Sequence, residues 1–247
     1  NFFDLGGHSL HATQVISRVC KVFSAEVPLQ TLFEHPSVEQ LSEALEQVLR
    51  GATQPVPALV PVPRDGDLPL SFAQERLWFL AQLAPDNPFY NVPTALRLEG
   101  TLDRDALAAA LAEIVRRHES LRSLFPARGG RPVNEIHPAP FLLEQLELEE
   151  DRLSDWIRDC SLRTFDLATQ LPMRGWLARL RGQSHVLLVV MHHIVSDGWS
   201  MGVFTRELEA LYRAFSQSQP SPLAPLALQY ADFASWQRGW MSGEVLR

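Results

Sequence analysis

The 247-residue sequence contains only two cysteines, Cys20 and Cys160. They form no CxxC pair, which argues against a disulfide framework or a zinc site and favours a reducing cytoplasm. Long hydrophobic runs are also missing: the longest candidate is VLLVVM at 186–191, whereas a membrane span needs roughly 18 apolar residues. The chain opens on a Gly-Gly loop where a signal peptide would have a basic and then an apolar segment. We therefore expect a cytoplasmic protein that does not enter membranes.

Positive charge is scarce as well. The sequence has 22 Lys and Arg against 29 Asp and Glu, and its net charge is -7. A nucleic-acid-binding protein usually carries a basic patch, so we do not expect DNA or RNA as a partner. Hydrophobic residues make up 46% of the chain, which is ordinary for a globular protein.

Prolines divide the chain into two parts. A segment without helical period, 51–69, contains five of them: Pro55, Pro57, Pro61, Pro63 and Pro69. Such a composition is typical of an extended, semi-rigid linker. We therefore predict one folded unit at 1–50 and a second at 70–247, joined by this linker.

The N-terminal unit has the pattern of a small helical bundle. Apolar residues recur at helical spacing after Ser9, which predicts a helix that begins near this residue. Ser37 and Gln40 have the spacing of a capping box at the start of another helix. Pro28 and Pro36 bracket a short helical turn between the two. So little apolar surface makes the unit marginal in stability by itself.

The second unit mixes helices and strands. Capping residues predict helices after Ser71 and after Asp103 or Thr101. Alternating residues predict strands at 92–100 and 142–149, and the segments MRGWLARL and HVLLVVMHH predict a β-hairpin. The second of these segments is apolar on both faces, as in a central strand. We expect an α/β (α+β) fold with helices on a central sheet.

A histidine pair follows this apolar strand, in the segment MHHIVSDGWS at 191–200. Side chains alternate along a strand, so His192 and His193 point to opposite faces and do not share one task. One can face a cleft while the other packs, although two hydrogen-bonded core histidines would give the same pattern. A metal site is not expected, since the histidines diverge and no Glu or Cys lies at ligand spacing.

Four segments in sequence order resemble the core motifs of condensation domains of nonribosomal peptide synthetases, which are relatives of chloramphenicol acetyltransferase. The motif HHxxxDG is the third of them, and it begins at His192. The others are SFAQERLWFL at 71–80, RHESLRSLF at 117–125 and YADFASW at 230–236. Ser123 stands where the second motif usually has Thr. The resemblance covers the second unit and implies the N-terminal part of a condensation domain, about the first of two chloramphenicol acetyltransferase-like lobes with the reaction channel between them.

The resemblance also implies a reaction, amide formation between two thioester-tethered substrates. His193 would point into the reaction channel, where it could act as a general base or hydrogen-bond the tetrahedral intermediate; the sequence leaves both roles open. No metal is needed. DGWS after the histidines favours condensation over epimerisation, and His192 argues against a cyclisation domain, which has aspartate there. Residues 71–93 resemble the class that joins an L-configured donor to an L-configured acceptor.

Three further residues receive roles from the same motifs. Asp197 would form a structural ion pair with an arginine of the second motif, by position Arg122, with Arg117 as the alternative. The pairing agrees with the cost of burying a carboxylate without a partner. Gly198 is expected to permit a tight turn and a close backbone approach that a side chain would block.

The N-terminal segment DLGGHSL contains Ser9, and with a condensation domain downstream it resembles the attachment motif of peptidyl carrier domains. The resemblance implies that Ser9 carries 4'-phosphopantetheine. A serine that only caps a helix would give the same local pattern. If Ser9 starts a helix, the helix dipole favours the added phosphate. His8 is then a loop neighbour and no catalytic base, because adjacent residues on a helix do not face each other.

The implied partners are those of an assembly line: a phosphopantetheinyl transferase, an upstream adenylation domain, a downstream carrier domain and the remainder of the condensation domain. We expect the first carrier helix and most of the second lobe to be missing, and the fragment to be inactive alone. Two other functions stay open, a non-catalytic docking protein and a coenzyme A-dependent acyltransferase of the same fold.

Overall fold

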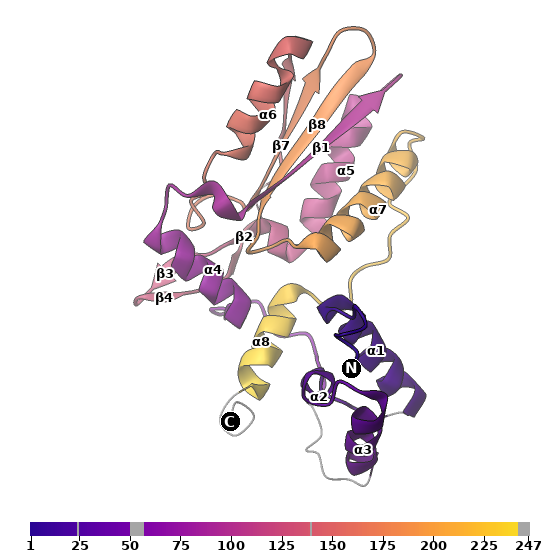
Figure 1. Ribbon diagram of the computed structural model, residues 1–247. Helices are drawn as coiled ribbons and strands as arrows, with labels where there is room; N and C mark the ends of the chain where they lie inside the picture. The colour runs from indigo at the N-terminus through magenta and orange to yellow at the C-terminus, as the bar shows by residue number, and fades with distance from the viewer. Residues whose placement is uncertain (24, 50–56, 139, 242–247) are drawn as a thin grey trace. The chain divides into compact units, whose positions relative to one another are not determined.

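A computed structural model describes residues 1–23, 25–49, 57–138 and 140–241. The chain forms two compact units, 1–58 and 59–247. In the described part of the first unit the helices are α1 (Ser9–Phe23), α2 (Gln30–Glu34) and α3 (Val38–Leu49), as Figure 1 shows. The two helices and the intervening helical turn expected from the sequence are therefore confirmed.

A small apolar core holds these three helices together. Ile16 of α1, Leu32 of α2 and Leu45 of α3 are buried in it together with Val27. The backbone N–H of Gln40 donates to Ser37 Oγ at 3.3 Å, which is one of the two bonds of the predicted capping box. The core of this unit is small because each short helix contributes only one or two buried side chains.

The second unit is built on a four-stranded sheet in the order β1-β8-β7-β6 (Figure 1). The strands are β1 (Asn91–Glu99), β6 (Leu143–Glu147), β7 (Met173–Arg179) and β8 (Ser184–His192). β8 pairs antiparallel with β1 and with β7, whereas β6 pairs parallel with β7. The predicted hairpin and the predicted central position of its second strand are confirmed.

Helices cover both faces of this sheet. Alternate residues of β8 pack against α5 (Arg104–Arg117) and α7 (Gly198–Phe215) in one apolar cluster. The intervening residues of β8 pack in a second cluster with α4 (Phe72–Leu83) and α6 (Leu153–Ser161). Every residue of β8 after Ser184 is buried as a result, which explains why its sequence lacks polar alternation.

Short elements and one further helix complete the second unit. They are the 3-10 turns η1 (Pro88–Tyr90), η2 (Glu119–Arg122) and η3 (Glu150–Arg152), the strand pairs β2 (Ser123–Leu124) with β5 (Glu135–Ile136) and β3 (Ala127–Arg128) with β4 (Arg131–Pro132), and α8 (Tyr230–Trp240). The predicted capping box of α4 is present, because Gln74 N donates to Ser71 Oγ and Ser71 N donates to Gln74 Oε1.

The predicted linker is only partly a separate segment. Its residues 51–56 lie outside the described part of the chain. The second compact unit begins at Leu59 and so includes residues 59–69 of the linker. Val62 N donates to Asp232 Oδ1 of α8 at 2.8 Å, and Leu68 forms a β-bridge with Asn134. The proline content predicts the extended backbone of this segment. It does not predict these two contacts, because Asp232 and Asn134 are distant in the sequence.

Candidate functional site

The two histidines at the end of β8 enter different surroundings. His192 is buried, and its ring lies 6.2 Å from the ring of Tyr90 and 6.0 Å from that of Phe165. His193 is exposed and lines a large cleft. Of the two alternatives that the sequence left open, the structure therefore shows the one in which one histidine packs and the other faces a cleft.

Burial keeps His192 neutral. It lowers the pKa of this imidazole to about 4, and the neighbouring charge of His193 acts in the same direction. The backbone N–H of Ile194 donates to His192 Nδ1 at 3.1 Å, which a neutral ring can accept. His192 thus fixes the turn that carries its neighbour, and it takes no part in proton transfer near neutral pH.

His193 is held at its backbone and at its ring. Its backbone N–H donates to the carbonyl of Tyr90 at 2.8 Å, and its Nδ1 is hydrogen-bonded to the carbonyl of Ser196. A carbonyl oxygen can only accept, so Nδ1 carries the proton of this bond. In the neutral ring Nε2 then keeps a free lone pair. The geometry gives His193 one fixed nitrogen and one nitrogen available to a substrate.

The cleft beside His193 has a volume of about 650 Å³. Its deep wall is apolar, with buried side chains from α5, η2, β8 and α7: Ile114, Leu121, Met191 and Phe204. Aromatic side chains stand at the mouth, where Phe89 is 79% and Trp199 62% exposed. A cavity that is mostly apolar with a few convergent polar groups is the usual form of a small-molecule site.

Asp197 lies at the same cleft, but its partner is not the predicted one. It is the N-cap of α7, where Oδ1 accepts from Ser200 N at 2.8 Å and from Ser200 Oγ at 2.6 Å. Partial burial by itself would raise the pKa of Asp197, yet these two bonds and the charge of His193 lower it below its ordinary value. Asp197 therefore orients the first turn of α7 beside the histidine.

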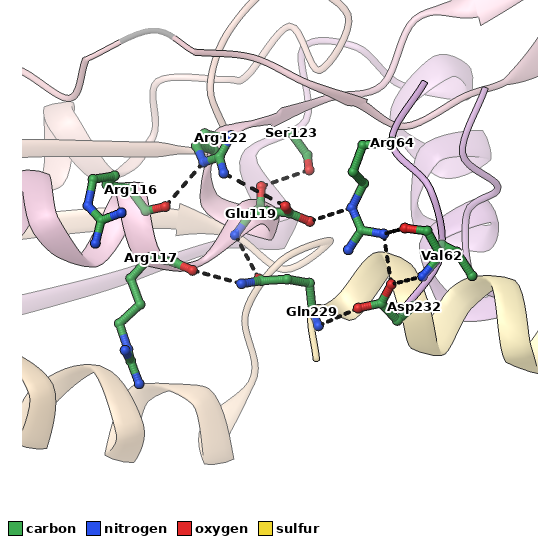
Figure 2. A network of polar contacts seen from close by, with 9 residues as sticks. All are labelled: Val62, Arg64, Arg116, Arg117, Glu119, Arg122, Ser123, Gln229 and Asp232. Atoms are coloured by element: carbon green, nitrogen blue, oxygen red, sulfur yellow. Dashed lines mark hydrogen bonds and ion pairs between the residues drawn. The ribbon is translucent and has the colours of Figure 1, made fainter. Parts of the chain in front are cut away.

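Neither candidate arginine reaches Asp197. Arg122 Nη2 lies 3.8 Å from Glu119 Oε1, and Arg122 Nε donates to the carbonyl of Arg116 at 3.4 Å (Figure 2). Arg117 Nε pairs with Glu207 Oε1 at 3.1 Å. Within the described residues Asp197 has no ion pair with either, so the predicted pairing is wrong for this chain. A helix cap meets the hydrogen-bonding needs of the carboxylate instead.

Gly198 shows no steric need for glycine in the described chain. A Cβ built on it meets nothing within 4 Å, and its φ does not lie in the left-handed region. It is the first residue of α7, directly after the Asp197 cap. The expectation that a side chain would collide here is therefore wrong as far as this chain's own atoms are concerned.

Sequence reasoning missed two polar residues of the site. His118 lines the cleft, and its Nε2 lies 2.7 Å from Glu207 Oε2 of α7. Gln74 is buried, and its Nε2 donates to the carbonyl of Ile194 at 3.4 Å, next to His193. Both residues lie inside the sequence motifs, His118 in the second and Gln74 in the first. Their place in these motifs was the signal by which the sequence could have identified them.

Ser9 lies in the first unit. It is the first residue of α1 and is exposed, while the preceding carbonyl of His8 accepts from Ala12 N at 2.9 Å. The cap position therefore belongs to His8, and Ser9 Oγ has no hydrogen-bond partner among the described residues. His8 stacks on His11, with ring centroids 3.9 Å apart. An exposed hydroxyl on the first helical turn fits a phosphodiester, which the positive end of the helix dipole favours.

Two kinds of feature are absent from the described residues. No group of three or more His, Cys, Asp or Glu side chains is placed to hold a metal ion. No helix combines the length and the apolar character that a membrane span requires.

Comparison with protein families assigns both units. The condensation domain family matches residues 64–245, and the phosphopantetheine attachment site family matches residues 1–45. Over its full length the chain is 50% identical to a linear gramicidin synthase polypeptide of Brevibacillus parabrevis, but it covers 3% of that protein. It is 42% identical to a dimodular nonribosomal peptide synthase of Bacillus subtilis, with 99% of this chain and 10% of that protein aligned.

Solved structures agree with this assignment. The X-domain of teicoplanin biosynthesis, solved in complex with OxyB, is 38% identical with a TM-score of 0.73, over 78% of this chain and 42% of that one. The first condensation domain of the calcium-dependent antibiotic synthetase, in complex with a substrate analogue, is 26% identical with a TM-score of 0.65, over 73% and 45% of the two chains. The chain belongs to the condensation domain family of nonribosomal peptide synthetases and carries a phosphopantetheine attachment domain ahead of its condensation unit.

Proposed function

We propose that the second unit takes part in peptide-bond formation between a donor and an acceptor aminoacyl group, each held as a thioester. The condensation family is a peptide-bond-forming, acyltransferase-type enzyme family. The observation that carries the proposal is the orientation of His193. Its Nδ1 is engaged by the Ser196 carbonyl, so the lone pair of Nε2 is free at a cleft large enough for a substrate.

The reaction follows from this geometry. The acceptor amine attacks the donor carbonyl carbon, a C–N bond forms, and the C–S bond of the thioester breaks as the thiolate leaves. His193 Nε2 accepts a proton from the attacking nitrogen and passes it to the leaving sulfur. His193 acts here as a base and not as a hydrogen-bond donor to the tetrahedral intermediate. The reason is its tautomer, because a neutral ring with Nδ1–H offers no proton at Nε2.

The test is replacement of His193 in a synthetase that carries this chain with the remainder of its condensation domain. Donor and acceptor are supplied as N-acetylcysteamine thioesters, and dipeptide is measured by mass spectrometry. His193→Ala should slow the reaction about 10²–10⁴-fold, the usual contribution of general acid–base catalysis. His137→Ala, an exposed histidine outside the cleft, should not. An undiminished rate in His193→Ala would overturn the assignment.

The isolated chain should form no dipeptide. It covers only 42% and 45% of two solved relatives, so the reaction channel of a full domain needs further chain. Peptide formation by the isolated chain that is lost in His193→Ala would contradict this expectation. The remainder of the condensation domain is therefore the first partner we propose.

A docking function is the second candidate. It is favoured by one observation, that the X-domain relative was solved as a complex with another protein, OxyB. The same assay separates the two functions, because a docking domain forms no dipeptide even in the full-length wild type. A coenzyme A-dependent transferase is less supported, since the phosphopantetheine attachment match at 1–45 indicates tethered substrates.

For the first unit we propose Ser9 as the residue that carries 4'-phosphopantetheine. Support comes from the family match and from the exposed hydroxyl on the first turn of α1. When bound, this group supplies the thiol that holds an aminoacyl group as a thioester. The partners are then a phosphopantetheinyl transferase, an upstream adenylation domain and a downstream carrier domain. A cytoplasmic location is supported by Cys20 and Cys160, which are both free thiols.

A further inference from the structure

A second imidazole lines the cleft that contains His193. His118 stands between α5 and η2, and its Nε2 lies 2.7 Å from Glu207 Oε2 on α7. The other oxygen of Glu207 pairs with Arg117 Nε at 3.1 Å. The side chains of both Glu207 and Arg117 are 12% exposed and that of His118 is 24% exposed. The carboxylate is therefore shielded, and it holds the ring in one orientation.

The bond to Glu207 determines which nitrogen of His118 is free. An ionised carboxylate only accepts hydrogen bonds, so Nε2 carries the proton. In the neutral ring Nδ1 keeps its lone pair, and no described residue hydrogen-bonds to it. His193 has the same arrangement with the nitrogens exchanged, because there a backbone carbonyl holds Nδ1. The cleft thus contains two oriented imidazoles, each with one nitrogen free to accept a proton.

Amide formation requires two proton acceptors. An α-amino group has a pKa of about 7.7–8.0, so most of the acceptor is an ammonium ion near pH 7. The nitrogen of R–NH₃⁺ keeps one hydrogen in the amide and loses two protons. The leaving thiolate takes one, which His193 delivers in the reaction proposed above. The other proton must leave the ammonium ion before the nitrogen can attack, and this proton needs a separate acceptor.

We propose that His118, oriented by Glu207, accepts this first proton through Nδ1 and so converts the bound ammonium into the attacking amine. The inference rests on the proposed peptide-bond formation. The products balance as one amide, one thiol and one proton, which His118 later releases to solvent.

The charges around His118 fit this task. Glu207 faces it from α7, and Arg117 of its own helix is neutralised by the same carboxylate. Arg76 of α4, His193 and Asp197 of the segment after β8, and Tyr230 of α8 line the same cleft. The carboxylate of Asp197 is engaged by Ser200. Among the described residues, the two imidazoles are therefore the side chains left in the cleft to accept a proton.

His118 can be replaced without removing the turn that it occupies. Its backbone N–H donates to the carbonyl of Ile114 at 3.0 Å, and its carbonyl accepts from Leu121 N at 3.0 Å. Neither bond uses the ring. Glu207 keeps its bond to Arg117 when His118 is changed, so no buried carboxylate is left unpaired.

The test is a pH–rate profile of His118→Gln in the same full-length synthetase, with N-acetylcysteamine thioesters and with thioester hydrolysis subtracted. At pH 7 the rate should fall about 5- to 10-fold, because roughly a tenth to a sixth of an amine with this pKa is already free base at that pH. By pH 9 it should return to within about 2-fold of wild type, because water then removes the proton from the ammonium. Glu207→Gln should show the same recovery with a smaller loss. His193→Ala should stay slow at every pH, and His137→Gln should follow the wild type.

Two results would overturn the inference: a loss that is equal at all pH values, which indicates a structural role, or no loss at pH 7. Should His118→Gln fail to fold, as judged by tryptophan fluorescence, the profile of Glu207→Gln decides in its place. Failure of the proposed function is recognised separately, since wild type would then form no dipeptide at any pH.

Discussion

At the scale of single residues, neighbouring histidines acquire opposite properties from their surroundings. His192 is enclosed by Tyr90 and Phe165, and burial lowers its pKa to about 4. His193 is exposed, with one nitrogen bound to a carbonyl. Only the first is held neutral by burial, and only the second has a free ring nitrogen at the cleft. His192 is therefore a structural residue, whereas His193 is available for the reaction, and the two roles can be tested separately.

We predict that His192 makes the second unit acid-sensitive. Its pKa is about 4 when folded and 6.5 when unfolded, so between these values the unfolded chain binds the extra proton. Stability is then fully present above pH 6.5 and falls by up to about 1.4 kcal/mol per unit as pH drops toward 4. His192→Asn, whose side-chain oxygen can accept from Ile194 N, should flatten this dependence.

Urea unfolding at pH 4.5–7.5, followed by tryptophan fluorescence, measures the effect. All six tryptophans lie at 78–240, within the second unit, so the signal reports on that unit alone. His185→Asn serves as control at the other end of β8, because it leaves His192 and its lowered pKa in place. An equal slope with pH in wild type and His192→Asn would contradict the prediction.

At the scale of elements, local signals in the sequence predicted most helices and strands. Ser71 and Gln74 lie three residues apart, so the capping box of α4 is contained in the sequence itself. The apolar run of β8 predicted its central position in the same way. The partners of polar side chains were not predictable, because His118 and Glu207 are 89 residues apart and Arg64 and Asp232 are 168 apart.

Figure 2 shows the second of these distant pairs. Arg64 Nη1 lies 2.7 Å from Asp232 Oδ1, and Arg64 Nε lies 3.0 Å from Glu119 Oε2. Burial by itself would raise the pKa of Asp232, but the bonds from Arg64 and from the backbone N–H groups of Val62 and Gln229 lower it. One guanidinium thus joins the segment before α4, the turn η2 and helix α8.

We predict that Arg64→Ala destabilises the second unit by about 3 kcal/mol, because it leaves the carboxylate of Asp232 buried without its counter-charge. Adding Asp232→Asn should restore part of this loss. Arg116→Ala is the matched control, since that side chain is 73% exposed and its exposed pair with Glu113 is worth about 0.2–1 kcal/mol. Urea unfolding measures all three variants, and equal losses in Arg64→Ala and Arg116→Ala would refute the role of Arg64.

At the scale of the whole molecule, the sequence order of the motifs predicted the family and the mixed fold, because a motif is recognised without its tertiary contacts. The same motifs misassigned the partner of Asp197 and the role of Gly198, since both depend on what approaches them in space. The two units match different families, the first an attachment domain and the second a condensation domain. Loading and bond formation should therefore be separable by mutation.

We predict that Ser9→Ala abolishes loading and leaves the cleft chemistry intact. Wild type incubated with a phosphopantetheinyl transferase and coenzyme A should gain the mass of one phosphopantetheinyl group, because Ser9 Oγ is exposed on the first turn of α1. Ser42→Ala is the control, an exposed serine in α3 of the same unit. In the full-length synthetase, Ser9→Ala should still convert N-acetylcysteamine thioesters, whereas His193→Ala should be loaded but slow. A mass gain in Ser9→Ala would place the attachment elsewhere in the chain and overturn the assignment of Ser9.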